Sequence, residues 1–195
     1  MRYYARPKSI QRKTIVMKQF NATIAILCAL TISGSALAQL SITPSNDTTL
    51  LKNALMGSVP DTRITITDIQ FQGAPTAAGT YLNGPLGIDD GIVLASGDVF
   101  NALPPNDEGA KGTSFDLSGC DECNSLIPGY TSYDAAILTL TFDVGAIDGV
   151  RFDFVFGSEE YPEYVGSPFN DVFGAFLNTT QIAFDQDGNP ITING

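Results

Sequence analysis

The residues whose types and spacing could do chemistry lie in one acidic stretch near the end of the sequence. Residues 158–164 read SEEYPEY, and residues 167–171 read SPFND. Carboxylate and amide oxygens are the ligands that Ca²⁺ prefers, and this ion accepts about six to eight of them in irregular loops. We therefore predict a calcium site formed by Glu159, Glu160, Asn170 and Asp171. A solvated acidic loop without a metal is the alternative that the residues leave open.

The same carboxylates also permit an enzymatic interpretation. Glu159 or Glu160 as general acid and Asp171 as base would suit the hydrolysis of a glycoside. However, the chain contains no histidine and no tryptophan, and a sugar-cleaving cleft usually offers aromatic platforms. We therefore predict a non-catalytic module for binding or adhesion. A carboxylate-dependent glycoside hydrolase and a structural spacer within a larger surface protein are the two alternatives.

Two of the three cysteines, Cys120 and Cys123, lie close together in the sequence, whereas Cys28 lies in an apolar run near the N-terminus. A zinc site would need further soft ligands, and the chain has no histidine to supply them. In an exported protein such a pair more often forms a disulfide. We therefore predict that Cys120 and Cys123 are joined.

The first 38 residues have the composition of a signal peptide. They carry six basic residues and no acidic one, and an apolar run follows at residues 22–32. This run is too short to span a bilayer, and the small residues Ala36 and Ala38 form a cleavage pattern. We predict cleavage between Ala38 and Gln39, which yields a secreted or cell-surface protein without stable membrane insertion. An uncleaved N-terminal membrane anchor is the alternative.

Cleavage at this point would leave a strongly acidic chain. All 21 acidic residues follow residue 38, whereas only four of the ten basic residues do, so the net charge of residues 39–195 is −17. A surface of this charge repels phosphate groups and anionic lipids. We therefore expect an extracellular protein or a carbohydrate as the ligand, and no nucleic acid.

The elements that must position these side chains are mostly short strands. One helix is expected at residues 48–56, where leucines recur at helical spacing between the capping residue Asp47 and Gly57. Beyond it, apolar and polar residues alternate with a period of two, which is typical of half-buried strands. The predicted strands cover residues 64–71, 92–95, 135–144, 150–156, 172–177, 181–184 and 191–193.

The connections between these strands indicate the fold class. Residues 145–149 form a link short enough to make the strands at 135–144 and 150–156 a hairpin, and residues 101–133 form a long irregular excursion. We predict a mainly β protein, an antiparallel β-sandwich or jelly roll with one short N-terminal helix. Residues 39–47 are expected to be a linker, and residues 48–195 a single domain that is truncated within its last strand.

The acidic stretch also closely resembles a known family. Residues 157–164 (GSEEYPEY) and 169–176 (FNDVFGAF) are similar to the paired motif of the choice-of-anchor L domain, a module of exported bacterial proteins. Residues 86–97, 134–138 and 141–143 match further segments of that family. The resemblance implies a surface or secreted domain to which no catalytic residue is assigned. Members precede differing C-terminal sorting signals, and none is recognisable up to Gly195.

Overall fold

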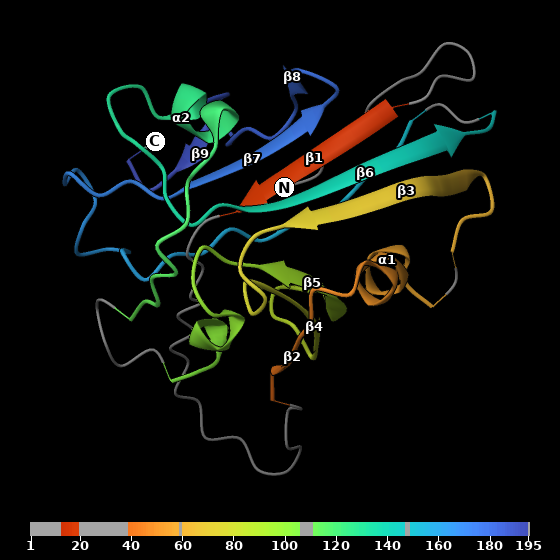
Figure 1. Ribbon diagram of the computed structural model, residues 1–195, viewed down its shortest axis with the longest axis horizontal. Helices are drawn as coiled ribbons and strands as arrows, with labels where there is room; N and C mark the ends of the chain where they lie inside the picture. The colour runs from red at the N-terminus through yellow and green to blue at the C-terminus, as the bar shows by residue number, and fades with distance from the viewer. Residues whose placement is uncertain (1–12, 20–38, 59, 106–110, 147–148, 195) are drawn as a thin grey trace.

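Two antiparallel sheets form the framework of the computed structural model, which describes residues 13–19, 39–58, 60–105, 111–146 and 149–194 (Figure 1). In the larger sheet the strand order is β3-β6-β1-β7-β8, and β9 also pairs with β7. Its strands are β1 (Lys13–Gln19), β3 (Ile64–Gln72), β6 (Ala136–Val144), β7 (Val172–Leu177), β8 (Thr180–Gln181) and β9 (Ile191–Thr192). The smaller sheet has the order β2-β4-β5 and comprises β2 (Ser41–Pro44), β4 (Ala78–Leu82) and β5 (Asp90–Leu94). The prediction of a mainly β, antiparallel fold is confirmed.

Strand β6 lies between β3 and β1 in the larger sheet and has the predicted alternation. Its even-numbered residues, from Ala136 to Val144, are buried in the main core, and Thr139, Thr141 and Asp143 are only half-buried. Because successive side chains of a strand point to opposite faces, this pattern directs one face of β6 toward the smaller sheet. The main core therefore lies between the two sheets and also contains Leu94 of β5 and Phe173 of β7.

The predicted helix is present as α1 (Thr48–Met56), which packs beside β3 and β5 (Figure 1). The Asp47 carboxylate accepts hydrogen bonds from the backbone N–H groups of Thr49 and Leu50 at 2.7 and 3.1 Å. Such a side chain satisfies donors that the first helical turn leaves unpaired. Leu51 is fully buried in the main core, so local capping and core packing select the same helix.

Two further helices are present where no helix was predicted. The 3-10 helix η1 (Val99–Ala102) and the helix α2 (Asp121–Leu126) lie in or beside the segment that we expected to be irregular. Both are single short turns without a repeating apolar pattern, so their sequences carry no helical period. Cys123 and Leu126 of α2 are nevertheless buried, in a second cluster on the outer side of the larger sheet with Val172 and Phe176.

The prediction of a strand at residues 150–156 is wrong, because the structure forms no strand there. These residues contain no named strand, although Phe152, Phe154 and Phe156 pack against the main core. The place beside β6 is taken by β1, which pairs antiparallel with β6 from Lys13 opposite Phe142 to Gln19 opposite Ala136. On its other side β1 pairs antiparallel with β7.

Strand β1 falls within the predicted signal peptide. We expected residues 1–38 to take no part in the fold, yet residues 13–19 form a strand of the larger sheet. The apolar run at 22–32 and Ala38 of the predicted cleavage site lie outside the described residues. Removal of residues 1–38 on export stays a prediction. Among the described residues, no helix is long and apolar enough to cross a membrane.

Candidate functional site

The acidic stretch forms one continuous loop, residues 158–171, which we call the acidic-aromatic loop. It follows residues 150–156 and leads directly into β7. Successive turns shape it: Tyr164 N–H donates to the Glu160 carbonyl at 2.9 Å, and Ser167 N–H donates to the Tyr164 carbonyl at 3.0 Å. These bonds fold the loop on itself, so that its two ends lie close together.

Two residues of the predicted site, Glu160 and Asp171, meet at the base of this loop. The Ser158 hydroxyl, which is almost fully buried, donates to Asp171 Oδ2 at 2.5 Å and accepts from the Glu160 N–H at 3.0 Å. The Asp171 N–H in turn donates to the Glu160 carboxylate. Ser158 thus connects Glu160 and Asp171, a role that the sequence analysis did not assign to it.

The two carboxyl groups resist ionisation. Burial, followed by the charge of Asp171, raises the pKa of Glu160 from 4.5 to about 7, against the opposing hydrogen bond from the Asp171 backbone. Burial also raises the pKa of Asp171 from 3.8 to about 6, although the hydrogen bond from Ser158 opposes that rise. Both shifts follow from removing a charge from water and placing like charges together. The base of the loop therefore favours protons or another cation.

The other two predicted calcium ligands take different positions. Glu159 is buried, with 4% of its surface exposed. Asn170 Oδ1 accepts a hydrogen bond from the Asn194 N–H at 3.1 Å, which ties it to the last described residue. Among the described residues, no group of three or more His, Cys, Asp and Glu side chains is placed to hold a metal ion. Calcium binding therefore stays a prediction.

The raised pKa values give a testable dependence of stability on pH. A carboxyl whose pKa is higher in the folded than in the unfolded state binds more protons when folded, so stability falls as the pH rises. For Glu160 this loss occurs between about pH 4.5 and about pH 7. We expect Glu160→Gln to stabilise the protein at pH 8, by about 1 kcal/mol or less because the side chain is partly solvated, and to change little at pH 4.

Urea denaturation at the two pH values measures this effect. Glu163→Gln, in an exposed residue of the same loop, serves as the matched control and should leave the difference between the two pH values unchanged. An equal effect of Glu160→Gln at pH 4 and pH 8 would show that the carboxyl of Glu160 is not destabilised by its surroundings.

Apolar and aromatic side chains cover the outside of the loop. Tyr161, Val165 and Phe169 have 41%, 53% and 56% of their surface exposed. The rings of Tyr164 and Phe169 pack edge to face with their centres 5.6 Å apart, and the Tyr161 hydroxyl donates to the Thr192 carbonyl at 3.1 Å. The loop thus presents large hydrophobic side chains to solvent while its backbone is held in place.

Two residues distant in sequence hold this loop, and the sequence analysis missed both. Asn194 Nδ2 donates to the carbonyls of Ser167 and Phe169 at 3.2 and 2.9 Å, and its Oδ1 accepts from the Gly166 N–H at 2.5 Å. The Tyr130 hydroxyl donates to the Ser167 carbonyl at 3.3 Å. No local pattern could reveal these contacts, because their partners are separated by at least 25 residues.

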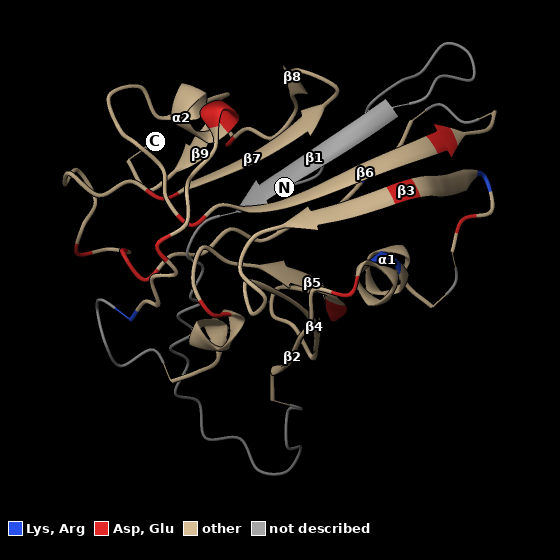
Figure 2. Cartoon of the chain, in the orientation of Figure 1, with Lys and Arg blue, Asp and Glu red and all other residues tan. Residues whose placement is uncertain are grey.

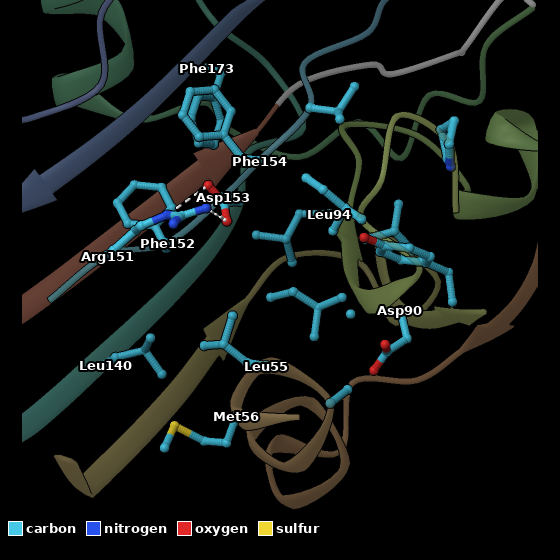
Figure 3. Close-up of a pocket in the computed structure, with 18 of the residues that line it drawn as sticks. Leu55, Met56, Asp90, Leu94, Leu140, Arg151, Phe152, Asp153, Phe154 and Phe173 are labelled. Atoms are coloured by element: carbon cyan, nitrogen blue, oxygen red, sulfur yellow. Dashed lines mark hydrogen bonds and ion pairs between the residues drawn. The ribbon is translucent and has the colours of Figure 1, made fainter. Parts of the chain in front are cut away.

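A separate cavity of about 530 Å³ lies between the sheets (Figure 3). Leu55 and Met56 of α1, Leu94 of β5 and Leu140 of β6 line it. Residues 150–155 complete the lining, and there Arg151 and Asp153 form an ion pair at 2.5 Å. None of the predicted acidic site residues lines this cavity. Because its walls are largely apolar, the cavity could not be found from the polar motifs.

The predicted disulfide is present and joins Cys120 to Cys123, with Cα atoms 5.1 Å apart. It spans the start of α2, where Cys120 is the N-cap residue. The Cys120 N–H donates to the Ser132 hydroxyl at 3.0 Å, and Asn124 Oδ1 accepts from the Ser132 N–H at 2.7 Å. The disulfide therefore belongs to a small network that fastens α2 to the segment before β6.

Comparison with known protein families agrees with this arrangement of motifs. The model of the Choice-of-anchor L domain family matches residues 40–194, and the chain therefore belongs to that family. No curated protein and no solved structure matches the chain. Membership indicates a surface-associated module of an exported protein.

Proposed function

We propose that this chain is a non-catalytic binding module at the cell surface or in the extracellular medium, and that it binds a basic protein through the acidic-aromatic loop. The observation that carries the proposal is the exposure of Tyr161, Val165 and Phe169 on one loop. Exposed apolar patches with a polar rim mark interaction sites, and tyrosine and phenylalanine are enriched in the centres of interfaces.

The loop needs little ordering before it can bind. Asn194 and Tyr130 fasten its backbone from outside, and the rings of Tyr164 and Phe169 pack against each other. A surface that is already ordered loses less conformational entropy on association. This preorganisation favours a recognition role over that of a passive connection between strands.

The charge of the chain indicates the chemistry of the partner. Acidic residues recur along the loops at the ends of the strands, and basic residues are few (Figure 2). In the loop, Glu163 is exposed beside Tyr161 and Tyr164. A partner that presents arginine or lysine would gain from charge complementarity and from cation contacts with the exposed rings. We therefore prefer a basic protein surface to a carbohydrate.

We also propose that Ca²⁺ binds at the base of the loop and stabilises it. The support is electrostatic, because Glu160 and Asp171 are close together and their pKa values are raised. An ion that binds only the folded form stabilises it by about 2.7 kcal/mol at a concentration a hundredfold above its dissociation constant. We expect a higher thermal midpoint in millimolar Ca²⁺ than in excess EDTA. Coincident midpoints would remove calcium from the proposal and leave the protein-binding role in place.

The two alternative functions gain no support from the geometry. A glycoside hydrolase would place its carboxylates in a cleft that holds the sugar, but Glu159, Glu160 and Asp171 lie outside the lining of the 530 Å³ cavity. A spacer domain would not require exposed hydrophobic side chains on an ordered loop.

The proposal is tested with peptides rich in arginine and lysine and, in parallel, with an array of glycans. We expect the double variant Tyr161→Ala/Phe169→Ala to lose at least about tenfold in affinity for the peptides that bind, since buried aromatic anchors dominate interfaces. Leu86→Ala changes a residue that is 78% exposed on a different loop, so it serves as the matched control. Binding to glycans alone would contradict the choice of partner, and unchanged binding by the double variant would contradict the choice of loop.

A further inference from the structure

We infer that residues 150–156 form a strand between β6 and β7 once residues 1–38 have been removed, in the position that β1 occupies in the full chain. This inference goes beyond the proposed function and concerns the same protein before and after export. It is carried by the position of β1, the course of the chain around it, and the side-chain pattern of residues 150–156.

Removal of β1 would leave a gap at the centre of the larger sheet. Strand β1 pairs antiparallel with β6 on one side and with β7 on the other, so β6 and β7 run parallel to each other. Without β1, both strands would present unpaired N–H and C=O groups, which are costly when shielded from water and available to another strand. Only a strand that is antiparallel to both neighbours restores the observed pattern.

Residues 150–156 have the position in the chain and the length that this gap requires. They follow β6 after a connection of five residues, and the acidic-aromatic loop then leads from them into β7. A chain that turns back after β6 and again before β7 runs antiparallel to both, which is the simplest connection of three neighbouring strands. The segment is seven residues long, as β1 is.

The side-chain pattern also fits the gap. In a hairpin that places Val150 opposite Val144, Phe152 lies opposite Phe142 and Phe154 lies opposite Leu140. Directly opposed residues of an antiparallel pair share a face, so these apolar residues join the core-facing side of β6. In the full chain, Lys13 of β1 lies opposite Phe142, Ile15 opposite Leu140 and Met17 opposite Leu138. Residues 150–156 thus place an apolar residue opposite Leu140, as β1 does, and a phenylalanine opposite Phe142, where β1 has a lysine.

The segment is already close to the required position. Val150, Phe152, Phe154 and Phe156 pack against the core to which β6 contributes, and the rings of Phe154 and Phe173 of β7 have their centres 4.6 Å apart (Figure 3). The cavity that the segment lines measures about 530 Å³, and its walls are largely apolar. Phenylalanine side chains that project from the sheet would occupy part of this space.

Hydrogen exchange followed by mass spectrometry distinguishes the two arrangements. It is measured on the full chain and on the exported chain, residues 39–195. We expect the amides of residues 150–156 to exchange at least about a hundredfold more slowly in the exported chain, while those of β6 and β7 stay protected in both. Unchanged exchange at 150–156 with β6 and β7 protected would overturn the inference. Loss of protection in β6 and β7 would also overturn it, because the sheet would then require β1.

A proline substitution provides a second measurement. Val155 lies outside any strand in the full chain, whereas proline in a central strand removes a ladder hydrogen bond. We expect Val155→Pro to lower the thermal midpoint of the exported chain far more than that of the full chain, and Val155→Ala to affect the two chains alike. Equal effects of Val155→Pro on both chains would contradict the inference. Peptide binding by the loop is a separate readout, so failure of the binding proposal would not affect this result.

Discussion

Replacing Leu138 with alanine is expected to destabilise the protein by about 3–4 kcal/mol, the cost of losing a fully buried leucine and leaving a cavity. Leu138 has none of its surface exposed and lies in β6, an inner strand of the larger sheet. Phe71 of β3 is its register partner on one side. Tight packing from several directions limits how far the surroundings can relax into the space left by the leucine.

Urea denaturation of the exported protein measures this loss. Thr139→Ala is the matched control, because Thr139 is the next residue of the same strand, points to the opposite face and is only half-buried. We expect the control to cost less than about 1 kcal/mol. Comparable losses at both positions would show that the main core is not centred on this face of β6.

The parts of the fold that could be predicted are those set by local patterns. Helix α1 has its cap, its apolar period and its terminating Gly57 within a dozen residues, and the structure reproduces the predicted bounds. Strand β6 alternates throughout, and the structure places its apolar positions in the core. In these elements the local conformation and the burial of side chains favour the same structure, so neighbouring residues carry the whole signal.

The parts that could not be predicted depend on partners far away in the sequence. Residues 150–156 have a strand pattern, but β1, more than a hundred residues earlier, occupies the place beside β6. An alternating pattern indicates that a segment can form a strand. It does not indicate which of two competing segments pairs with a given neighbour. The short helix α2 is stabilised by the disulfide and by burial against β7, neither of which produces a helical period.

The candidate site, like the fold, could be predicted only in part from local patterns. The sequence motifs group Glu160 with Asp171, and the structure brings these two residues together because the loop between them returns to the start of β7. The motifs do not indicate that Asn170 bonds to Asn194, or that the buried Ser158 bridges the two acids. Residue types indicate which chemistry is available, whereas the hydrogen-bond partners depend on the final packing.

The second large loss of stability is expected on substitution of Asp134. This residue precedes β6 and holds the preceding irregular segment against the sheet. Its carboxylate accepts hydrogen bonds from the N–H groups of Leu117 and Phe115 at 2.7 and 3.2 Å and from the Ser114 hydroxyl at 3.2 Å. Its own N–H donates to the Leu117 carbonyl at 2.9 Å. Bonds to a charged group contribute about 1.5–3 kcal/mol each, and the Phe115 donor is partly buried, so water replaces its lost partner less well than at the exposed donors.

We therefore expect Asp134→Ala to destabilise the protein by about 2–4 kcal/mol. Asp134→Asn is the matched control, because its amide oxygen keeps one acceptor and asparagine tolerates the positive φ of 51° at this position. It should cost clearly less. Urea denaturation measures both variants, and a loss in Asp134→Ala no larger than in Asp134→Asn would show that the carboxylate does not fasten the segment.

The same substitution tests how the excursion supports the binding loop. The excursion between Leu117 and Asp134 carries Tyr130, whose hydroxyl donates to the Ser167 carbonyl of the acidic-aromatic loop. If Asp134 keeps this excursion in place, Asp134→Ala loosens Tyr130 and with it one support of the loop. We expect weaker peptide binding by Asp134→Ala under conditions where the variant is still folded, and a similar weakening by Tyr130→Phe, which removes only the hydroxyl. Weaker binding by Asp134→Ala together with unchanged binding by Tyr130→Phe would assign the effect to the excursion itself rather than to its bond with the loop.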